Sequence, residues 1–166
     1  MLPGCDPTRI AIVASSYGAY TTALAIDALP SIRAFVFWAP VSHPQKLVDR
    51  DMTPAAWQFI EKTGWIEHFG QRMGRGFIDG LPDFDAPAKL ATLPRPLLVL
   101  HGKGDKHVPI EQGRAYLEAM KGIDGNSQLI ELETEDHGMR SVAMNDRLVE
   151  ESAKWCRRFL HPEAKA

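Results

Sequence analysis

The sequence is constrained most by residues 10–29, where a short apolar run passes through a serine pair into a helix-compatible segment. Residues 10–14 (IAIVA) are apolar throughout, which is typical of a strand buried on both faces of a parallel sheet. Residues 19–29 are rich in small and helix-compatible side chains and predict a helix. The residues between them leave room only for a sharp turn, so the stretch is predicted to be one strand–turn–helix unit.

The turn itself carries a pattern close to the G-x-S-x-G nucleophile elbow, in which a strained turn exposes a serine oxygen above a sheet. The pattern selects Ser16 over Ser15, because only Ser16 has a small residue on both sides at a distance of two, Ala14 and Gly18. Ala14 carries one methyl group more than the usual glycine. A plain strand-to-helix turn, with Ser15 or Ser16 as the N-cap, is the alternative.

Three further strands follow at residues 34–38, 96–101 and 127–132, separated by segments that include predicted helices at 110–120 and 142–160. Strands that alternate with helices predict a parallel sheet with right-handed crossovers. The strand at 127–132 is the most polar, which favours a place near a sheet edge. The inward-facing residues expected in the helix at 110–120 are Ile110, Tyr116, Leu117 and Met120.

The connection over residues 41–93 is too long for a plain crossover. Structureless loops of that length are uncommon in compact domains, and a lid or cap is the usual exception. We therefore expect a single domain over residues 1–166 with a helical, lid-like insertion at 41–93. A helical excursion packed on the sheet is the alternative.

Composition excludes several classes of function. A formal net charge of −2 over 166 residues gives no electrostatic reason to bind nucleic acid or an anionic membrane. The sequence contains neither a membrane span nor a signal peptide, which predicts a cytoplasmic protein. Cys5 and Cys156 lie at opposite ends and are expected to be free thiols. The glycines at 102 and 104 lack the spacing of a phosphate loop, and no cofactor is expected.

An acid and a base follow the last two predicted strands. Asp105 comes just after the strand at 96–101, and His137 comes just after the strand at 127–132. Because the carboxyl ends of parallel strands share one edge of a sheet, both side chains are expected near Ser16. An imidazole activates a serine hydroxyl when an acid fixes its tautomer and stabilises its cation. The order Ser16, Asp105, His137 is that of an α/β-hydrolase.

Two other interpretations of these loops remain. Asp136 is adjacent to His137 and is a second candidate for the acid. His101, Asp105 and His107 form a possible set of metal ligands, although His101 ends a strand and no metal site is expected.

The whole chain resembles the C-terminal half of an α/β-hydrolase, close to the dienelactone hydrolase and prolyl-oligopeptidase-like esterases and peptidases. The similar segments are DPTRIAIV before the elbow, ASSYG at the elbow, HGKGDKHVP as acid loop and EDHGM as histidine loop. The resemblance implies a serine esterase or peptidase with Ser16 as nucleophile, Asp105 as acid and His137 as base. It also implies that the backbone N–H of Tyr17 is one oxyanion donor, and that the substrate is a small ester or a peptide.

The chain departs from the family at its start, because full members have four further strands before the elbow strand and a loop among them supplies the second oxyanion donor. Without them, the apolar strand at 10–14 becomes a sheet edge, and an exposed apolar edge attracts another chain. We therefore expect a homodimer or another oligomer joined through this edge. The alternative is a non-catalytic half-hydrolase, or an interaction subunit that needs a partner chain.

Overall fold

The structure is a computed structural model, and it describes residues 6–68, 71–81, 84–123, 126–134 and 136–161. The chain divides into two compact units. The first contains the described residues of Met1–Ser42 and Asp85–Ala166, and the second is His43–Phe84. The insertion predicted at 41–93 thus contains the whole second unit, followed by a helix that belongs to the first.

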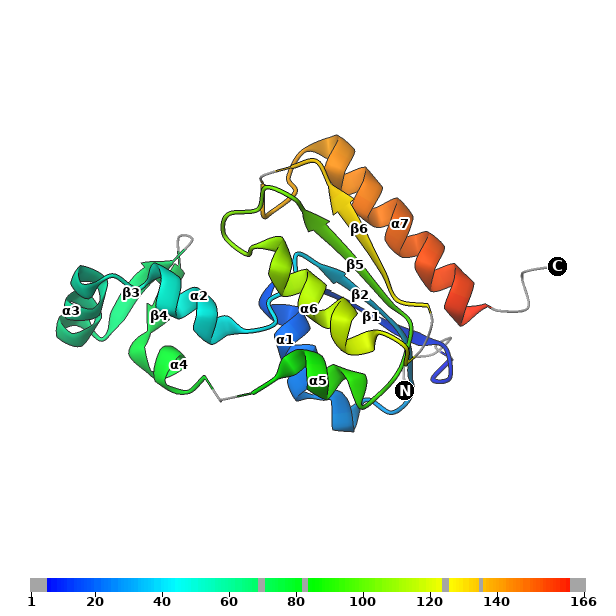
Figure 1. Ribbon diagram of the computed structural model, residues 1–166, viewed down its shortest axis with the longest axis horizontal. Helices are drawn as coiled ribbons and strands as arrows, with labels where there is room; N and C mark the ends of the chain where they lie inside the picture. The colour runs from blue at the N-terminus through cyan, green and yellow to red at the C-terminus, as the bar shows by residue number, and fades with distance from the viewer. Residues whose placement is uncertain (1–5, 69–70, 82–83, 124–125, 135, 162–166) are drawn as a thin grey trace. The chain divides into compact units, whose positions relative to one another are not determined.

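The first unit is built on a four-stranded parallel sheet (Figure 1). The strands lie in the order β1-β2-β5-β6, with the bounds β1 Ile10–Ser15, β2 Ile32–Trp38, β5 Leu97–Gly102 and β6 Gln128–Leu132. All four predicted strands are confirmed, and each observed strand end differs from the predicted one by no more than two residues. The polar strand β6 lies at one edge of the sheet, as predicted.

Helices cover both faces of this sheet (Figure 1). Four helices belong to it, together with a short 3₁₀ helix at Ile26–Ala28: α1 Tyr17–Leu24, α5 Ala86–Ala91, α6 Ile110–Met120 and α7 Val142–Leu160. In both α6 and α7 the helix bounds equal those predicted. The Ser141 hydroxyl starts α7 by accepting a hydrogen bond from the Met144 N–H, as an N-cap does.

Alternation along the strands sorts the core into two layers. In β2, Ala34 and Val36 face α7, where they pack in one cluster with Leu148 and Trp155 of that helix. The next residue, Phe37, packs on the other side, with its ring centroid 5.3 Å from that of Tyr116 in α6. The sheet is therefore apolar on both faces, which explains the near-continuous hydrophobic runs in β2 and β5.

Helix α6 differs in one respect from its predicted inward face. Ile110, Tyr116 and Met120 are buried as predicted, whereas Leu117 is only half-buried. Two residues without an apolar side chain, Gln112 and Gly113, are buried in its place. Gln112 is buried because its side-chain oxygen accepts hydrogen bonds from the backbone and hydroxyl of Ser42.

The second unit contains three helices and a small antiparallel hairpin: α2 Pro44–Asp51, α3 Pro54–Thr63, β3 Trp65–His68, β4 Gln71–Gly74 and α4 Arg75–Asp79. Val48, Ile60 and Ile78 form its own small core. Helix α3 is capped at its C-terminus by Gly64, whose φ of 79° is a left-handed conformation that suits glycine. The hairpin is a difference from the purely helical insertion that the sequence predicts.

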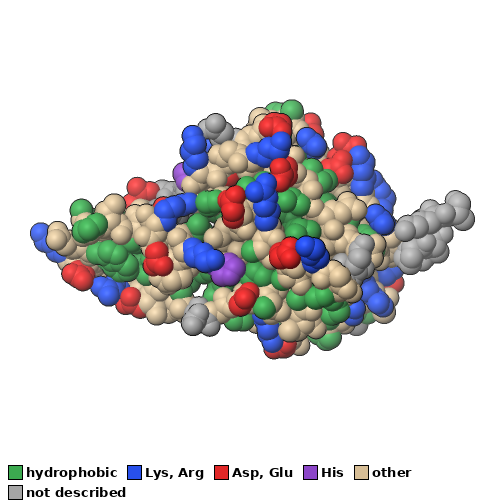
Figure 2. Space-filling view, viewed as in Figure 1, with side chains coloured by type: hydrophobic (Ala, Val, Ile, Leu, Met, Phe, Trp, Pro, Cys, Tyr) green, Lys and Arg blue, Asp and Glu red, His purple; other side chains and the backbone are tan. Residues whose placement is uncertain are grey.

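Strand β1 forms the other edge of the described sheet, as predicted. Its apolar side chains are correspondingly exposed, with 40% of Ile10 and 49% of Val13 accessible. On the visible face of the molecule, basic and acidic side chains are interspersed (Figure 2). Among the described residues, no helix has both the length and the apolar character needed to cross a bilayer. Cys156 is a free thiol, and Cys5 lies outside the described residues.

Candidate active site

Ser16 occupies a strained turn between β1 and α1. Its φ of 53° and ψ of −121° are unusual for a residue other than glycine. Backbone bonds hold it there, because its N–H donates to the Trp38 carbonyl at 2.9 Å and its own carbonyl accepts from Val41 at 3.0 Å. A Cβ atom on Gly18 would lie 3.5 Å from the Cβ of Ala14, an ordinary contact distance, so β1 and α1 approach each other closely at these two small residues.

The hydroxyl of Ser16 does not cap the following helix. Ser16 stands at the N-cap position of α1, yet its side chain makes no capping hydrogen bond. Instead, Oγ lies 3.1 Å from Nε2 of His137. The N-cap interpretation therefore fits the position of the residue but not the direction of its hydroxyl.

Asp105 lies in the loop between β5 and α6 with its side chain fully buried. Its Oδ1 accepts the backbone N–H groups of His107 and Val108, each at 3.0 Å, and its Oδ2 accepts from Nδ1 of His137 at 2.7 Å. Burial alone would raise the pKa of Asp105, but the hydrogen bonds from His137 and Val108 lower it below the usual value. The carboxylate is therefore ionised at neutral pH.

His137 connects the two groups. It follows β6, its side chain is 19% exposed, and it contacts Asp105 through Nδ1 and Ser16 through Nε2. Since an ionised carboxylate only accepts hydrogen bonds, Nδ1 carries the proton and Nε2 is free to accept the proton of the serine hydroxyl. The three predicted side chains thus form one hydrogen-bonded line at the carboxyl edge of the sheet.

The structure separates the two candidate acids. Asp136 turns away from His137 and accepts hydrogen bonds from the backbone N–H groups of Gly138, at 3.1 Å, and Arg140, at 2.8 Å. Its pKa is lowered by these bonds and by the Arg140 side chain. Asp136 therefore shapes the histidine loop, while Asp105 contacts the imidazole.

Two further predicted groups lie near this line. Tyr17 is the first residue of α1, so its backbone N–H belongs to the helix turn that directly follows Ser16. The ring of the exposed His107 lies 6.2 Å from that of His137, centroid to centroid. Among the described residues, no three His, Cys, Asp or Glu side chains are grouped so that they could hold a metal ion.

Sequence reasoning missed the environment of His101. Its ring is fully buried on the α6 face of β5, and Nε2 lies 2.8 Å from the carbonyl oxygen of Val108 in the acid loop. The available signal was a histidine at the last apolar position of a strand that leads directly into the acid loop. The pattern could not indicate which atom the imidazole contacts.

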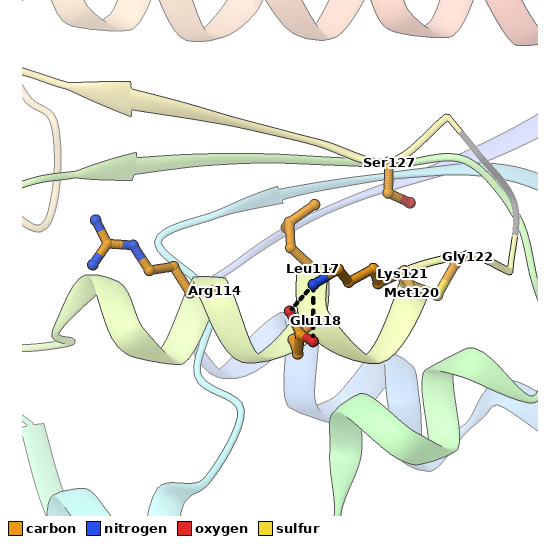
Figure 3. A pocket seen from close by; sticks show the side chains of 7 residues that line it. All are labelled: Arg114, Leu117, Glu118, Met120, Lys121, Gly122 and Ser127. Atoms are coloured by element: carbon orange, nitrogen blue, oxygen red, sulfur yellow. Dashed lines mark hydrogen bonds and ion pairs between the residues drawn. The ribbon is translucent and has the colours of Figure 1, made fainter.

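A separate open pocket lies at the other end of the sheet (Figure 3). Its lining comes from α6 and the residues that follow it: Arg114, Leu117, Glu118, Met120, Lys121, Gly122 and Ser127. Ser127 immediately precedes β6, whereas His137 follows that strand. Because the strands are parallel, the pocket lies at the amino edge of the sheet and is not part of the site around Ser16.

A sequence model described as the prolyl oligopeptidase family matches residues 3–163. No curated protein matches the chain. Among solved structures, the esterase domain of a Rhodothermus marinus protein has a TM-score of 0.67 at 19% identity, covering 90% of this chain and 60% of that one. A puromycin-hydrolysing peptidase of Mycobacterium tuberculosis has a TM-score of 0.69 at 22% identity, covering 95% and 23%. Mouse alpha/beta hydrolase domain-containing protein 10 has a TM-score of 0.64 at 20% identity, covering 89% and 62%.

These likenesses establish the fold, in agreement with the resemblance seen in the sequence. The four-stranded sheet and its helices are part of an α/β-hydrolase fold. The chain spans 60% of the Rhodothermus esterase domain and 23% of the mycobacterial peptidase.

Proposed function

The chain belongs to the prolyl oligopeptidase family, and from that premise we propose that it is a serine hydrolase acting on ester or amide bonds. In this proposal Ser16 is the nucleophile, His137 the general base and Asp105 the acid. The observation that carries it is the line of two hydrogen bonds, 2.7 Å from Asp105 to His137 and 3.1 Å from His137 to Ser16.

The proposed reaction follows from the donors and acceptors in this line. Nε2 of His137 takes the proton of the Ser16 hydroxyl while Oγ forms a bond to the acyl carbon of the substrate. The imidazolium then gives that proton to the leaving oxygen or nitrogen as the old acyl bond breaks. A water molecule then attacks the acyl carbon while Nε2 takes its proton, and the imidazolium returns that proton to Oγ of Ser16 as the bond between Oγ and the acyl carbon breaks. Asp105 stays ionised throughout and stabilises the imidazolium.

The negative charge that develops on the acyl oxygen needs donors. We assign one donor to the Tyr17 backbone N–H, because it follows the nucleophile at the start of α1, where the helix dipole also favours an anion. Removal of one such donor lowers turnover by about 10²–10³.

The similar structures support an acyl substrate without selecting one bond type. Their names describe an esterase domain and a puromycin-hydrolysing peptidase. A small ester or a peptide-like amide is therefore the substrate class that we propose for this chain.

A fluorophosphonate probe tests the proposal, since it phosphonylates an activated serine and leaves ordinary hydroxyl groups intact. We expect the probe to label Ser16, and expect Ser16→Ala to abolish both labelling and p-nitrophenyl acetate hydrolysis. Ser15→Ala is the matched control, because this neighbouring serine ends β1 and precedes the turn. A folded chain in which Ser16 stays inert would favour the alternative of a non-catalytic half-hydrolase or interaction subunit.

We further propose that a second copy of the chain pairs with the β1 edge. The support is the exposure of Ile10 and Val13 on an apolar edge strand, which is a template for strand addition. Size-exclusion chromatography with light scattering should give the mass of a dimer. Val13→Lys should shift it to a monomer, whereas Val149→Lys, a control at an exposed valine of α7, should not. A monomeric native chain would refute this pairing.

A further inference from the structure

Outside the line from Ser16 to Asp105, the most unusual group in the first unit is the imidazole of His101. It is completely buried on the α6 face of β5, beneath the acid loop. Burial lowers its pKa below the ordinary value, against the opposing effect of its hydrogen bond to the Val108 carbonyl. The ring is therefore neutral at the pH at which a serine hydrolase works.

The tautomer of His101 follows from its contact. A carbonyl oxygen only accepts hydrogen bonds, so the Nε2 atom that lies 2.8 Å from Val108 O must carry the proton. Nδ1 is then an acceptor, and it is buried with no hydrogen-bond partner among the described residues. Nε2 is also 3.7 Å from Asp105 Oδ2, which is too long for a hydrogen bond.

Accommodating this ring carries two local costs. A buried acceptor without a partner is destabilising, because it has lost its hydrogen bond to water and gained none in the protein. Helix α6 also has a glycine in its interior, which is less stable there than alanine. The two costs concern the same atom, because a Cβ on Gly113 would lie 2.6 Å from Nδ1 of His101. Both costs are thus incurred at a ring whose one hydrogen bond, among the residues that the structure describes, goes to the acid loop.

That bond is the first link of a continuous chain. His101 donates to the carbonyl of Val108, and the N–H of Val108 donates to Oδ1 of Asp105. Oδ2 of Asp105 then accepts from His137, whose Nε2 contacts Ser16. One residue, Val108, is thus held through its carbonyl by a rigid strand and through its amide by the acid. Its amide is one of the two backbone N–H groups, with that of His107, that hold Oδ1 of Asp105.

We propose that His101 is a positioning residue that holds the acid loop through Val108, so that the Asp105 carboxylate faces His137. It touches neither substrate nor the reacting atoms. The proposal rests on the proposed function for its kinetic consequence, but its structural consequence is independent of catalysis.

Two substitutions separate the hydrogen bond from the volume of the ring. His101→Leu keeps a buried side chain of similar size without a donor, and His101→Gln places an amide N–H near the position of Nε2. Val99→Ala is the control for lost packing, since Val99 is buried on the same face of the same strand and also borders Gly113. All three are compared with wild type after their folded state has been verified by near-UV circular dichroism.

The kinetic measurement determines kcat and KM separately, with p-nitrophenyl acetate as substrate. We expect His101→Leu to lower kcat about ten- to a hundredfold with little change in KM, because a small misplacement of a catalytic group has a cost of this order. His101→Gln should recover most of that loss, and Val99→Ala should show none of it. A folded His101→Leu variant with wild-type kcat would overturn the proposal, and so would an equal loss in Val99→Ala.

The second readout is hydrogen exchange at the Val108 amide, which needs no activity. We expect His101→Leu to speed exchange of this amide at least about tenfold more than Val99→Ala does, because local opening of the loop no longer breaks the His101 bond. Equal exchange in the two variants would overturn the proposal even if Ser16 were inert. Conversely, an inert Ser16 with the expected exchange pattern would contradict only the proposed function.

If His101→Leu does not fold, the wild-type protein still tests the proposal by nitrogen NMR of the His101 ring. The expected result is a neutral ring with an exchange-protected proton on Nε2 across pH 6–8, the range about the ordinary histidine pKa. A proton on Nδ1, or an unprotected Nε2 proton, would show that the ring does not hold Val108.

Discussion

Asp105→Asn gives the sharpest test of the proposed chemistry, because the structure determines how the new amide would be oriented. Oδ1 accepts two backbone N–H groups, from His107 and Val108. Only the amide oxygen of the new side chain can accept these two bonds. An NH₂ group at the same place is itself a donor and could not accept the N–H groups of His107 and Val108. The NH₂ group must therefore face Nδ1 of His137.

This orientation reverses the proton on the imidazole. With a donor opposite it, Nδ1 becomes an acceptor and the proton moves to Nε2, which lies 3.1 Å from the Ser16 hydroxyl. An N–H at that position cannot take the serine proton. In serine hydrolases the wrong tautomer lowers kcat by about 10⁴, so we expect a loss of about 10³–10⁴, or about 4–5.5 kcal/mol in the activation barrier.

The assay is the rate of fluorophosphonate labelling together with p-nitrophenyl acetate turnover, measured on folded protein. Asp136→Asn is the matched control, because Asp136 is adjacent to His137 in sequence but bonds to the Gly138 and Arg140 backbone. We expect it to lose less than about tenfold, as for a change that leaves the His137 tautomer intact. If Asp105→Asn kept activity within tenfold of wild type, or if Asp136→Asn lost as much, the assignment of the acid would be refuted.

Two further predictions concern stability. Tyr116→Phe should lower the free energy of unfolding, measured by urea denaturation, by about 1–3 kcal/mol. The reason is that the buried Tyr116 hydroxyl donates to the Val41 carbonyl at 2.9 Å, and its loss leaves that oxygen without this donor. An unchanged denaturation midpoint would mean that water replaces the hydroxyl. Stability should also fall as the pH decreases below about 6.5, because the pKa of His101 is lowered in the folded chain and only the unfolded chain takes up this proton. The difference in Tm between wild type and His101→Gln, followed from pH 8 to pH 5, should therefore shrink or reverse toward acid, and a constant difference would contradict burial of a neutral ring.

Much of the fold could be predicted because its signals are local. The apolar runs that became β1, β2 and β5, and the spacing that became α6 and α7, depend on neighbours within a few residues. The hairpin β3–β4 gave no such signal, since its two strands are only four residues each and lie in a small unit with its own core. Gly113 was also unpredictable, because its place inside a helix is explained by a ring on another element.

The sequence by itself determined that a serine, an acid and a histidine follow separate parallel strands, and this topology alone brings them to one edge of the sheet. Only the tertiary structure shows that Asp105 and not Asp136 contacts the His137 imidazole, that the Ser16 hydroxyl faces His137 and not the helix, and that His101 lies beneath the acid loop. The physical reason is that these choices depend on side-chain directions across large sequence separations, 121 residues between Ser16 and His137 and 32 between His137 and Asp105. Periodicity sets which face of a strand or helix a residue occupies, but the atom it contacts is set by the packing of the other elements around it.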